Sequence, residues 1–285
     1  MKREQSFNFF AQMMPLLVVV SGCQPASETE QQAESDSVPT TERLVPQFEV
    51  DPSWPMLPND WVLGSVASVD VDSRDHVWIY HRPRSVDEAQ QANAAPAVLE
   101  FDPEGNFVQG WGGPGGGYEW PANEHGIEVD DQGYVWLGGN GGGASSDDML
   151  LKFTRDGELV MQIGGRNTSG GNGDTDNLNR PAEAAVYRDT NEVFVADGYG
   201  NRRVIVFDAD TGAYKRMWGA FDNEPIDASD EQPPSDAELG PLQFGTVHGI
   251  EVSTDGLVYV SDRDLNRIQV FSIDGDYQTQ VFVNR

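Results

Sequence analysis

Two of the four histidines open the same pentapeptide, His-Gly-Ile-Glu-Val, at His125 and again at His248. Imidazole nitrogens are common ligands of zinc, so two histidines in one repeated context are candidate metal ligands. The repetition also predicts that both occupy the same place in a repeated structural unit. The alternative interpretation is that they only satisfy hydrogen bonds of that repeated framework.

Three further side chains could do chemistry beside these histidines: Arg82, Tyr199 and Arg263. Two guanidinium groups can clamp a carboxylate through paired hydrogen bonds. Positive neighbours favour the ionised form of a phenol, which can then act as a general base. Simpler roles are an ion pair between Arg263 and a neighbouring aspartate, and packing between repeats for Tyr199.

These residues are carried by a repeat in which apolar and polar residues alternate on both sides of a turn that is acidic in most copies. Such period-two alternation across a turn is typical of an antiparallel β-hairpin. Three copies have the same length, and the fourth has a turn that is one residue longer. The copies span residues 69–79, 127–137, 250–260 and 184–195.

Each copy continues into two more strand-like segments, the first of which is an apolar run at residues 98–102, 150–153, 204–208 or 268–271. One small four-stranded sheet cannot bury both of its faces, so repeated units of this kind predict a radial β-propeller. We therefore predict an all-β fold, with a propeller domain over residues 42–285 and a β-sandwich as the alternative. Both histidines would open the innermost strand of their blade, where the other two blades have Ala67 and Ala182.

The segments between the second and third strands resemble NHL repeats, because residues 197–204 and 261–268 share an Asp, Asn, Arg, apolar pattern. The NHL resemblance implies a six-bladed propeller. The chain carries four such blades, so we expect a form that is truncated by two. Alternate blades of six are related by about a three-fold rotation, and a histidine from the sixth blade would complete a zinc triad with His125 and His248.

Together these positions resemble the lyase domain of peptidylglycine α-amidating enzymes, which cleaves peptidyl-α-hydroxyglycine to a peptide amide and glyoxylate. By this resemblance, His125 and His248 would bind zinc, which polarises the substrate hydroxyl. Tyr199 would remove the proton of that hydroxyl. Arg82 and Arg263 would stabilise the substrate carboxylate and the tyrosinate.

The same resemblance implies that the backbone carbonyls of Val69 and Ile127 bind a structural calcium ion. The third histidine of the family and the calcium-binding aspartate beside it have no counterpart in this sequence. An inactive chain is therefore one expected outcome. Two loops, 111–118 and 221–240, are particular to this sequence and are read as connections, with a substrate lid as the alternative.

The first forty residues predict export and a membrane anchor. A basic start is followed by an apolar stretch and by Val-Ser-Gly-Cys, which resembles the lipobox of bacterial lipoproteins. We predict a signal peptide over residues 1–22, lipid attachment at Cys23 and a flexible acidic tether over residues 23–41. Gln24 after the cysteine favours the outer membrane. The alternative is an ordinary secretory signal with a chance cysteine.

Charge restricts the partners that the protein can bind. The chain has 47 acidic and 18 basic residues, a net charge of −29, which repels nucleic acid and anionic membrane surfaces. We expect a small-molecule or peptide substrate outside the cytoplasm, with the membrane reached through the lipid anchor alone. The oligomeric state is left open.

Three functions remain after these exclusions. The first is a zinc-dependent lyase that resembles peptidylamidoglycolate lyase and breaks a C–N bond. The second is a non-catalytic scaffold that binds a protein, peptide or glycan. Lactone hydrolysis ranks last, because it needs carboxylates around calcium where this sequence has histidine or alanine.

Overall fold

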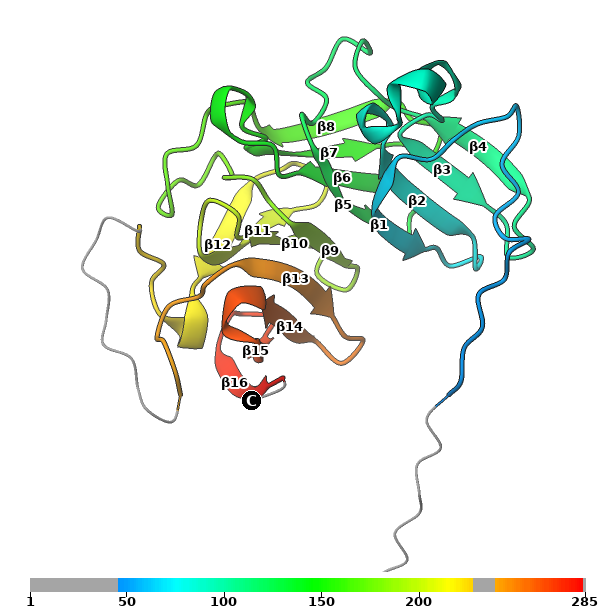
Figure 1. Ribbon diagram of the computed structural model, residues 1–285. Helices are drawn as coiled ribbons and strands as arrows, with labels where there is room; N and C mark the ends of the chain where they lie inside the picture. The colour runs from blue at the N-terminus through cyan, green and yellow to red at the C-terminus, as the bar shows by residue number, and fades with distance from the viewer. Residues whose placement is uncertain (1–45, 228–238, 284–285) are drawn as a thin grey trace, which may run out of the picture. The chain divides into compact units, whose positions relative to one another are not determined.

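The computed structural model describes residues 46–227 and 239–283, and within them the chain forms four antiparallel sheets of four consecutive strands each. We call these sheets blades 1 to 4 (Figure 1). Blade 1 comprises β1 (Ser65–Val71), β2 (Val77–Arg82), β3 (Val98–Phe101) and β4 (Phe107–Trp111). Blade 2 comprises β5 (Glu124–Val129), β6 (Val135–Gly139), β7 (Met149–Phe153) and β8 (Leu159–Gly164).

The second half of the chain repeats this arrangement. Blade 3 comprises β9 (Glu183–Tyr187), β10 (Glu192–Asp197), β11 (Arg203–Asp208) and β12 (Tyr214–Trp218). Blade 4 comprises β13 (Val247–Val252), β14 (Leu257–Asp262), β15 (Arg267–Ser272) and β16 (Tyr277–Phe282). The connections contain 3-10 helices η1 (Pro83–Ser85), η2 (Glu88–Asn93), η3 (Gly143–Ser145), η4 (Ala220–Asp222) and η5 (Arg263–Leu265).

The predicted all-β fold of four-stranded, blade-like sheets is confirmed. All of the strands lie in a compact unit that spans Val50–Arg285, whereas the described part of the other unit, residues 46–49, is exposed and carries no strand. None of the helices among the described residues has the length and apolar character to cross a membrane. The predicted signal peptide, Cys23 and the tether over residues 23–41 lie outside the described residues and stay predictions, as does residue 42 as the start of the propeller domain.

The acidic turns fix the first hairpin of blades 1 and 2. In blade 2, Oδ1 of Asp130 accepts the backbone N–H groups of Gln132 (3.0 Å) and Tyr134 (2.9 Å). Its Oδ2 accepts the indole N–H of Trp136 at 3.0 Å. An aspartate that bonds the backbone a few residues ahead stabilises a turn, so the repeated Asp sets both the hairpin and the position of the buried tryptophan. Asp72 and Trp78 form the same pair in blade 1, at 3.1 Å.

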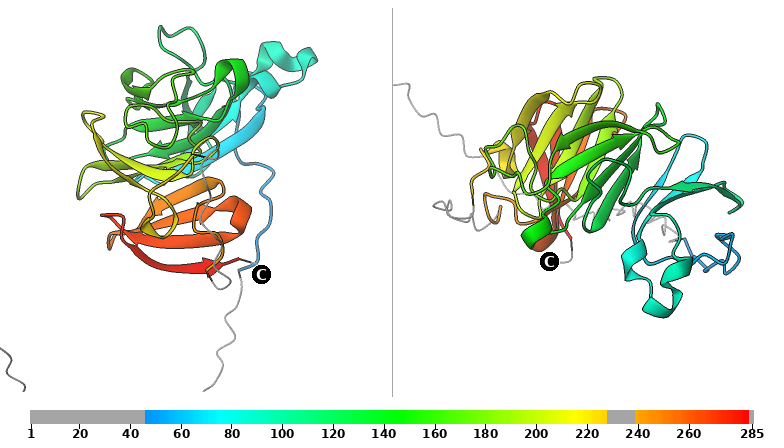
Figure 2. Two further views of the ribbon diagram at one scale, coloured as in Figure 1. Left: turned by 90° about the vertical axis from the view of Figure 1, so that its left-hand side faces the viewer. Right: turned by 90° about the horizontal axis from the view of Figure 1, so that it is seen from above.

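The core consists of apolar layers between successive blades, which stand side by side (Figure 2). Trp78 and Tyr80 of blade 1 pack with Ile127 and Leu137 of blade 2 in one such layer. Blade 1 has a further apolar face, which residues 54–63 cover with Trp54, Leu57, Trp61 and Leu63. The inner strands β1, β5, β9 and β13 contact one another in chain order, so side chains of different blades can meet along them.

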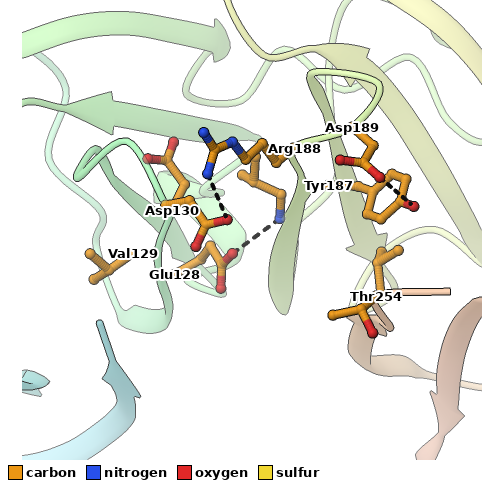
Figure 3. A pocket seen from close by; sticks show the side chains of 10 residues that line it. Glu128, Val129, Asp130, Tyr187, Arg188, Asp189 and Thr254 are labelled. Atoms are coloured by element: carbon orange, nitrogen blue, oxygen red, sulfur yellow. Dashed lines mark hydrogen bonds and ion pairs between the residues drawn. The ribbon is translucent and has the colours of Figure 1, made fainter. Parts of the chain in front are cut away.

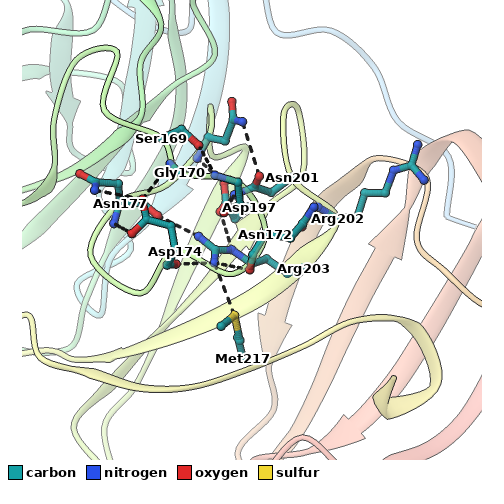
Figure 4. A network of polar contacts seen from close by, with 12 residues as sticks. Ser169, Gly170, Asn172, Asp174, Asn177, Asp197, Asn201, Arg202, Arg203 and Met217 are labelled. Atoms are coloured by element: carbon teal, nitrogen blue, oxygen red, sulfur yellow. Dashed lines mark hydrogen bonds and ion pairs between the residues drawn. The ribbon is translucent and has the colours of Figure 1, made fainter. Parts of the chain in front are cut away.

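Blade 3 also carries a buried ion pair, between Arg203 and Asp197 (Figure 4). Both side chains are 0% exposed, and Nε of Arg203 lies 2.9 Å from Oδ2 of Asp197. The other guanidinium nitrogens donate to the backbone carbonyls of Asn172 (2.7 Å) and Asn177 (2.8 Å). The loop before blade 3 therefore wraps around a fixed positive charge. Arg267 and Asp262 form the equivalent pair in blade 4, at 3.0 Å.

Candidate functional site

Inner strands β5 and β13 position the two histidines, and each strand is irregular at that point. The pairing of β5 with β6 shifts register between Glu124 and Ile127, and that of β13 with β14 shifts between Val247 and Gly249. A β-bulge turns a side chain away from the regular alternation and is common beside functional sites. His125 and His248 lie within these irregular stretches.

The two imidazoles meet at the hydroxyl of Tyr199. Nε2 of His125 lies 2.9 Å from Oη of Tyr199, and Nε2 of His248 lies 3.0 Å from the same oxygen. The ring centroids of the two histidines are 5.1 Å apart. Blades 2, 3 and 4 therefore each contribute one side chain to a single cluster, which we call the histidine–tyrosine site.

Both histidines are held in the neutral form that a metal ligand needs. Burial lowers the pKa of His125 to about 4, aided by the positive charges of Arg82 and Arg263 and by repulsion from His248 when that residue is protonated. Burial and the charge of Arg263 also lower the pKa of His248. Nδ1 of His125 lies 2.8 Å from the backbone carbonyl of Ala182, so Nδ1 carries the proton and the Nε2 lone pair faces Tyr199.

Arg263 completes the surroundings of the Tyr199 hydroxyl. Its NH1 donates to Oη at 3.2 Å, and its guanidinium carbon lies 5.2 Å from the centre of the phenol ring. Its Nε also pairs with Asp264 at 3.3 Å. The ion pair between Arg263 and a neighbouring aspartate, which was the simpler role considered from the sequence, is therefore present. It leaves NH1 of Arg263 directed at Tyr199.

Arg82 lies at the end of β2 and joins the site through the backbone. Its Nε donates to the carbonyl of Glu124, the residue before His125, at 2.9 Å. The structure therefore brings together all five side chains that the sequence singled out for zinc binding and catalysis. Their roles in binding and catalysis stay predictions.

Val69 and Ile127, the predicted calcium-binding positions, lie on the neighbouring inner strands β1 and β5. Val69 pairs with Ile79 and Ile127 with Leu137, each within its own blade. The Val69 side chain is 57% exposed, whereas that of Ile127 is buried. Calcium binding by their carbonyls stays a prediction.

A second group could hold a metal ion, and it lies in blade 1. Asp72, His76 and Glu100 each offer one ligand atom, and these atoms lie within 4.8 Å of one another. Guanidinium groups already bond both carboxylates: NH2 of Arg74 lies 3.1 Å from Asp72 and 2.9 Å from Glu100, and Arg155 contacts the same two residues. A metal ion there would have to displace two positive charges. This group was not predicted from the sequence, although His76 and the acidic turn are part of the repeat at residues 69–79.

The inner strands are also joined by carboxylates that accept backbone N–H groups of the next blade. Asp70 accepts from Val129 (2.6 Å), Glu128 from Val186 (3.1 Å) and Glu183 from Ile250 (3.0 Å). Glu183 holds the strand that carries His248, because Ile250 lies two residues after this histidine. Glu183 stands in a position where blades 2 and 4 have glycine, a difference that would have marked it in the sequence.

The pKa of Glu183 predicts a pH-dependent stability. Burial, reinforced by the negative charges of Glu251 and Asp70, raises its pKa from 4.5 to about 7. Because this pKa is raised in the folded state, folding favours the protonated carboxyl of Glu183. The stability that this protonated form contributes is complete below pH 4.5 and is lost as the pH rises through 7. The difference between the pKa values of the folded and unfolded states corresponds to about 3 kcal/mol of unfolding free energy. Glu183→Gln keeps an oxygen for Ile250 and removes this dependence.

The measurement is denaturant unfolding of both proteins at pH 4.5 and at pH 8. The unfolding free energy of the wild type relative to Glu183→Gln is expected to fall by about 3 kcal/mol between the two pH values. Other groups, Glu251 and Asp70 among them, titrate in both proteins, so their contribution to the unfolding free energy cancels in this difference. An equal difference at both pH values would contradict the assignment.

The structure also has a cavity of about 310 Å³, and Figure 3 shows the side chains that line it. It is bordered by the turns after the inner strands of blades 2, 3 and 4, and its lining includes Glu128, Tyr187, Arg188, Asp189 and Thr254. None of the five predicted site residues lines it. We therefore place the candidate chemistry at the histidine–tyrosine site, where the reactive groups converge.

Comparisons with known proteins place the chain among NHL-repeat relatives. It is 27% identical to human NHL repeat-containing protein 3 over 239 residues, which cover 82% of this chain and 58% of that protein. It is 24% identical over 223 residues to a probable peptidyl-alpha-hydroxyglycine alpha-amidating lyase of Caenorhabditis elegans, covering 74% of this chain and 56% of the lyase. The chain thus spans little more than half the length of these relatives.

No protein-family model matches the chain. Among solved structures, a catalytically inactive variant of virginiamycin B lyase from Staphylococcus aureus has a TM-score of 0.46 and 15% sequence identity to this chain. The similarity covers 80% of this chain and 58% of that structure.

Proposed function

We propose that this chain is a metal-dependent lyase. The proposal starts from its similarity, as an NHL-repeat β-propeller, to NHL repeat-containing protein 3 and to the α-amidating lyases. Its substrates would be small α-hydroxy amides, with peptidyl-α-hydroxyglycine as the reference compound. The observation that carries the proposal is the convergence of His125, His248 and Arg263 on the hydroxyl of Tyr199.

The two histidines fit a zinc ion in protonation state and orientation. The Nδ1–H group of His125 donates to the carbonyl of Ala182, which leaves the lone pair of Nε2 for a metal ion. His125 and His248 would hold the metal through Nε2, and the bound ion would polarise the substrate hydroxyl. The third histidine that the related lyases use has no counterpart among the described residues.

The other side chains of the site supply substrate binding and proton transfer. Arg82 uses its Nε to hold the carbonyl of Glu124, so its two terminal nitrogens remain as donors for the substrate carboxylate. Arg263 donates to Oη of Tyr199 and stabilises the phenolate. The phenolate can then act as the general base.

In the proposed reaction, Tyr199 takes the proton of the substrate hydroxyl. The electron pair of that O–H bond forms the carbonyl of glyoxylate while the C–N bond breaks. The amide nitrogen leaves with the electron pair of the C–N bond, and Tyr199 returns the proton to it. The products are a peptide amide and glyoxylate, and the phenolate is restored.

The test is glyoxylate release from a synthetic peptidyl-α-hydroxyglycine by the zinc-loaded protein. We expect glyoxylate and peptide amide in equal amounts, and loss of the reaction when zinc is removed by a chelator. A folded, zinc-loaded protein that releases no glyoxylate would contradict the lyase. It would favour the non-catalytic scaffold that binds a protein, peptide or glycan.

A further inference from the structure

The loop that carries Tyr199 is wedged between two neighbours. A Cβ atom added to Gly198 would lie 1.9 Å from the backbone oxygen of Val247, and one added to Gly200 would lie 1.9 Å from Oδ1 of Asn179. Neither position has room for a side chain, so the flanks of Tyr199 are packed against blade 4 and against the segment before β9. The orientation of the phenol therefore depends on how the backbone of Tyr199 is held.

Arg180 holds that backbone directly. Its NH2 donates to the carbonyl oxygen of Tyr199 at 2.7 Å. The preceding residue, Asn179, fixes both ends of the same loop, because its N–H donates to Asp197 (2.8 Å) and its carbonyl accepts from Gly200 (2.9 Å). Arg180 thus acts on the one peptide carbonyl that belongs to Tyr199 itself.

The local conformation of Arg180 indicates that this contact is maintained at a cost. Its φ is +58°, in the left-handed region that residues with a side chain seldom adopt. Backbone strain of this kind is concentrated at functional sites. The guanidinium also lies against Gly142, where a Cβ atom would come within 3.3 Å of NH1.

We propose that Arg180 is a positioning residue that keeps the Tyr199 hydroxyl between the two histidines. The position of Oη follows the direction of the Cα–Cβ bond, which the Tyr199 peptide sets. A rotation of that peptide would move Oη away from the Nε2 atoms, which now lie 2.9 and 3.0 Å from it. The catalytic consequence rests on the proposed function, whereas the placement of the phenol does not.

The variants are matched for shape and for strain. Arg180→Met keeps the aliphatic stem and the left-handed backbone but loses the donors. Arg180→Lys keeps a donor for the Tyr199 carbonyl. The control is Arg188→Met, on the turn after β9, where the arginine side chain is 73% exposed.

The first readout needs neither metal nor activity. The chain has eight tyrosines, so the metal-free protein labelled with 3-fluorotyrosine gives a small set of fluorine resonances. The Tyr199 resonance is the one missing from Tyr199→Phe. We expect it to shift or broaden in Arg180→Met and to keep its position in Arg180→Lys and Arg188→Met. An unmoved Tyr199 resonance in Arg180→Met, or equal movement of all tyrosines, would overturn the proposal.

The second readout separates this inference from the proposed function. If the wild type releases glyoxylate, Arg180→Met should lower kcat by about 10- to 100-fold with little change in KM, because the base is misplaced while the substrate contacts remain. Arg180→Lys should recover most of that loss. If the wild type releases none, the lyase proposal fails and the fluorine resonance still decides the role of Arg180.

Discussion

Replacing Tyr199 with phenylalanine is expected to lower kcat for glyoxylate release by about 10²- to 10⁴-fold, the usual contribution of a general base. Phenylalanine keeps the ring, its packing against both imidazoles and its contact with Arg263. It removes Oη together with the hydrogen bond that Oη accepts from Arg263. In the proposed reaction, Oη takes the substrate proton and returns it. KM should change little, because the predicted carboxylate contacts come from arginine side chains.

A matched variant separates this effect from the loss of any phenol. Tyr187→Phe removes a hydroxyl whose contact is with Asp189 at 3.4 Å, on the turn after β9. It should leave kcat unchanged. If Tyr199→Phe keeps more than about a third of the wild-type kcat, Tyr199 is not the base and the proposed proton transfer is wrong.

Replacing Arg203 with methionine is expected to lower the unfolding free energy by about 3–5 kcal/mol, as when one partner of a buried ion pair is removed. Asp197 would remain as a buried charge without the guanidinium that faces it at 2.9 Å. The carbonyls of Asn172 and Asn177 would also lose their donor. Chemical denaturation, read as the change in midpoint at constant slope, measures the loss.

Two further variants test the cause of this loss. Arg188→Met removes an exposed arginine whose nearest acidic oxygen, on Asp131, is 4.0 Å away, and should change stability by less than about 0.5 kcal/mol. The double variant Asp197→Asn, Arg203→Met should be more stable than Arg203→Met alone, because the unpaired charge is gone. A loss below about 1 kcal/mol in Arg203→Met would contradict the buried-pair account.

The blades were predictable because each depends on local patterns. Alternation around the turn at 130–133 predicted the hairpin of β5 and β6, and the turn aspartate that shapes it is visible in the sequence. The meeting of His125 and His248 also followed from the sequence. Identical pentapeptides in equivalent inner strands must lie at the same level of the fold.

The support of the site was not predictable, because it is made by contacts between blades. Glu183 differs from the glycine of blades 2 and 4, but its partner Ile250 is 67 residues away, and no local pattern records their bond. The register shifts at His125 and His248 depend on pairing with the second strand of each blade. Arg180 adopts a left-handed conformation that its residue type disfavours, so tertiary contacts, rather than local preference, set its backbone.

Calorimetric titration of the metal-free protein with zinc shows directly whether the histidine–tyrosine site is the metal centre. We expect one zinc site in the wild type, and an affinity for zinc at least about 100-fold weaker in His125→Gln and in His248→Gln. His76→Gln, in the blade 1 group of Asp72 and Glu100, should bind zinc like the wild type. Loss of binding in His76→Gln, with full affinity in both other variants, would contradict the claim.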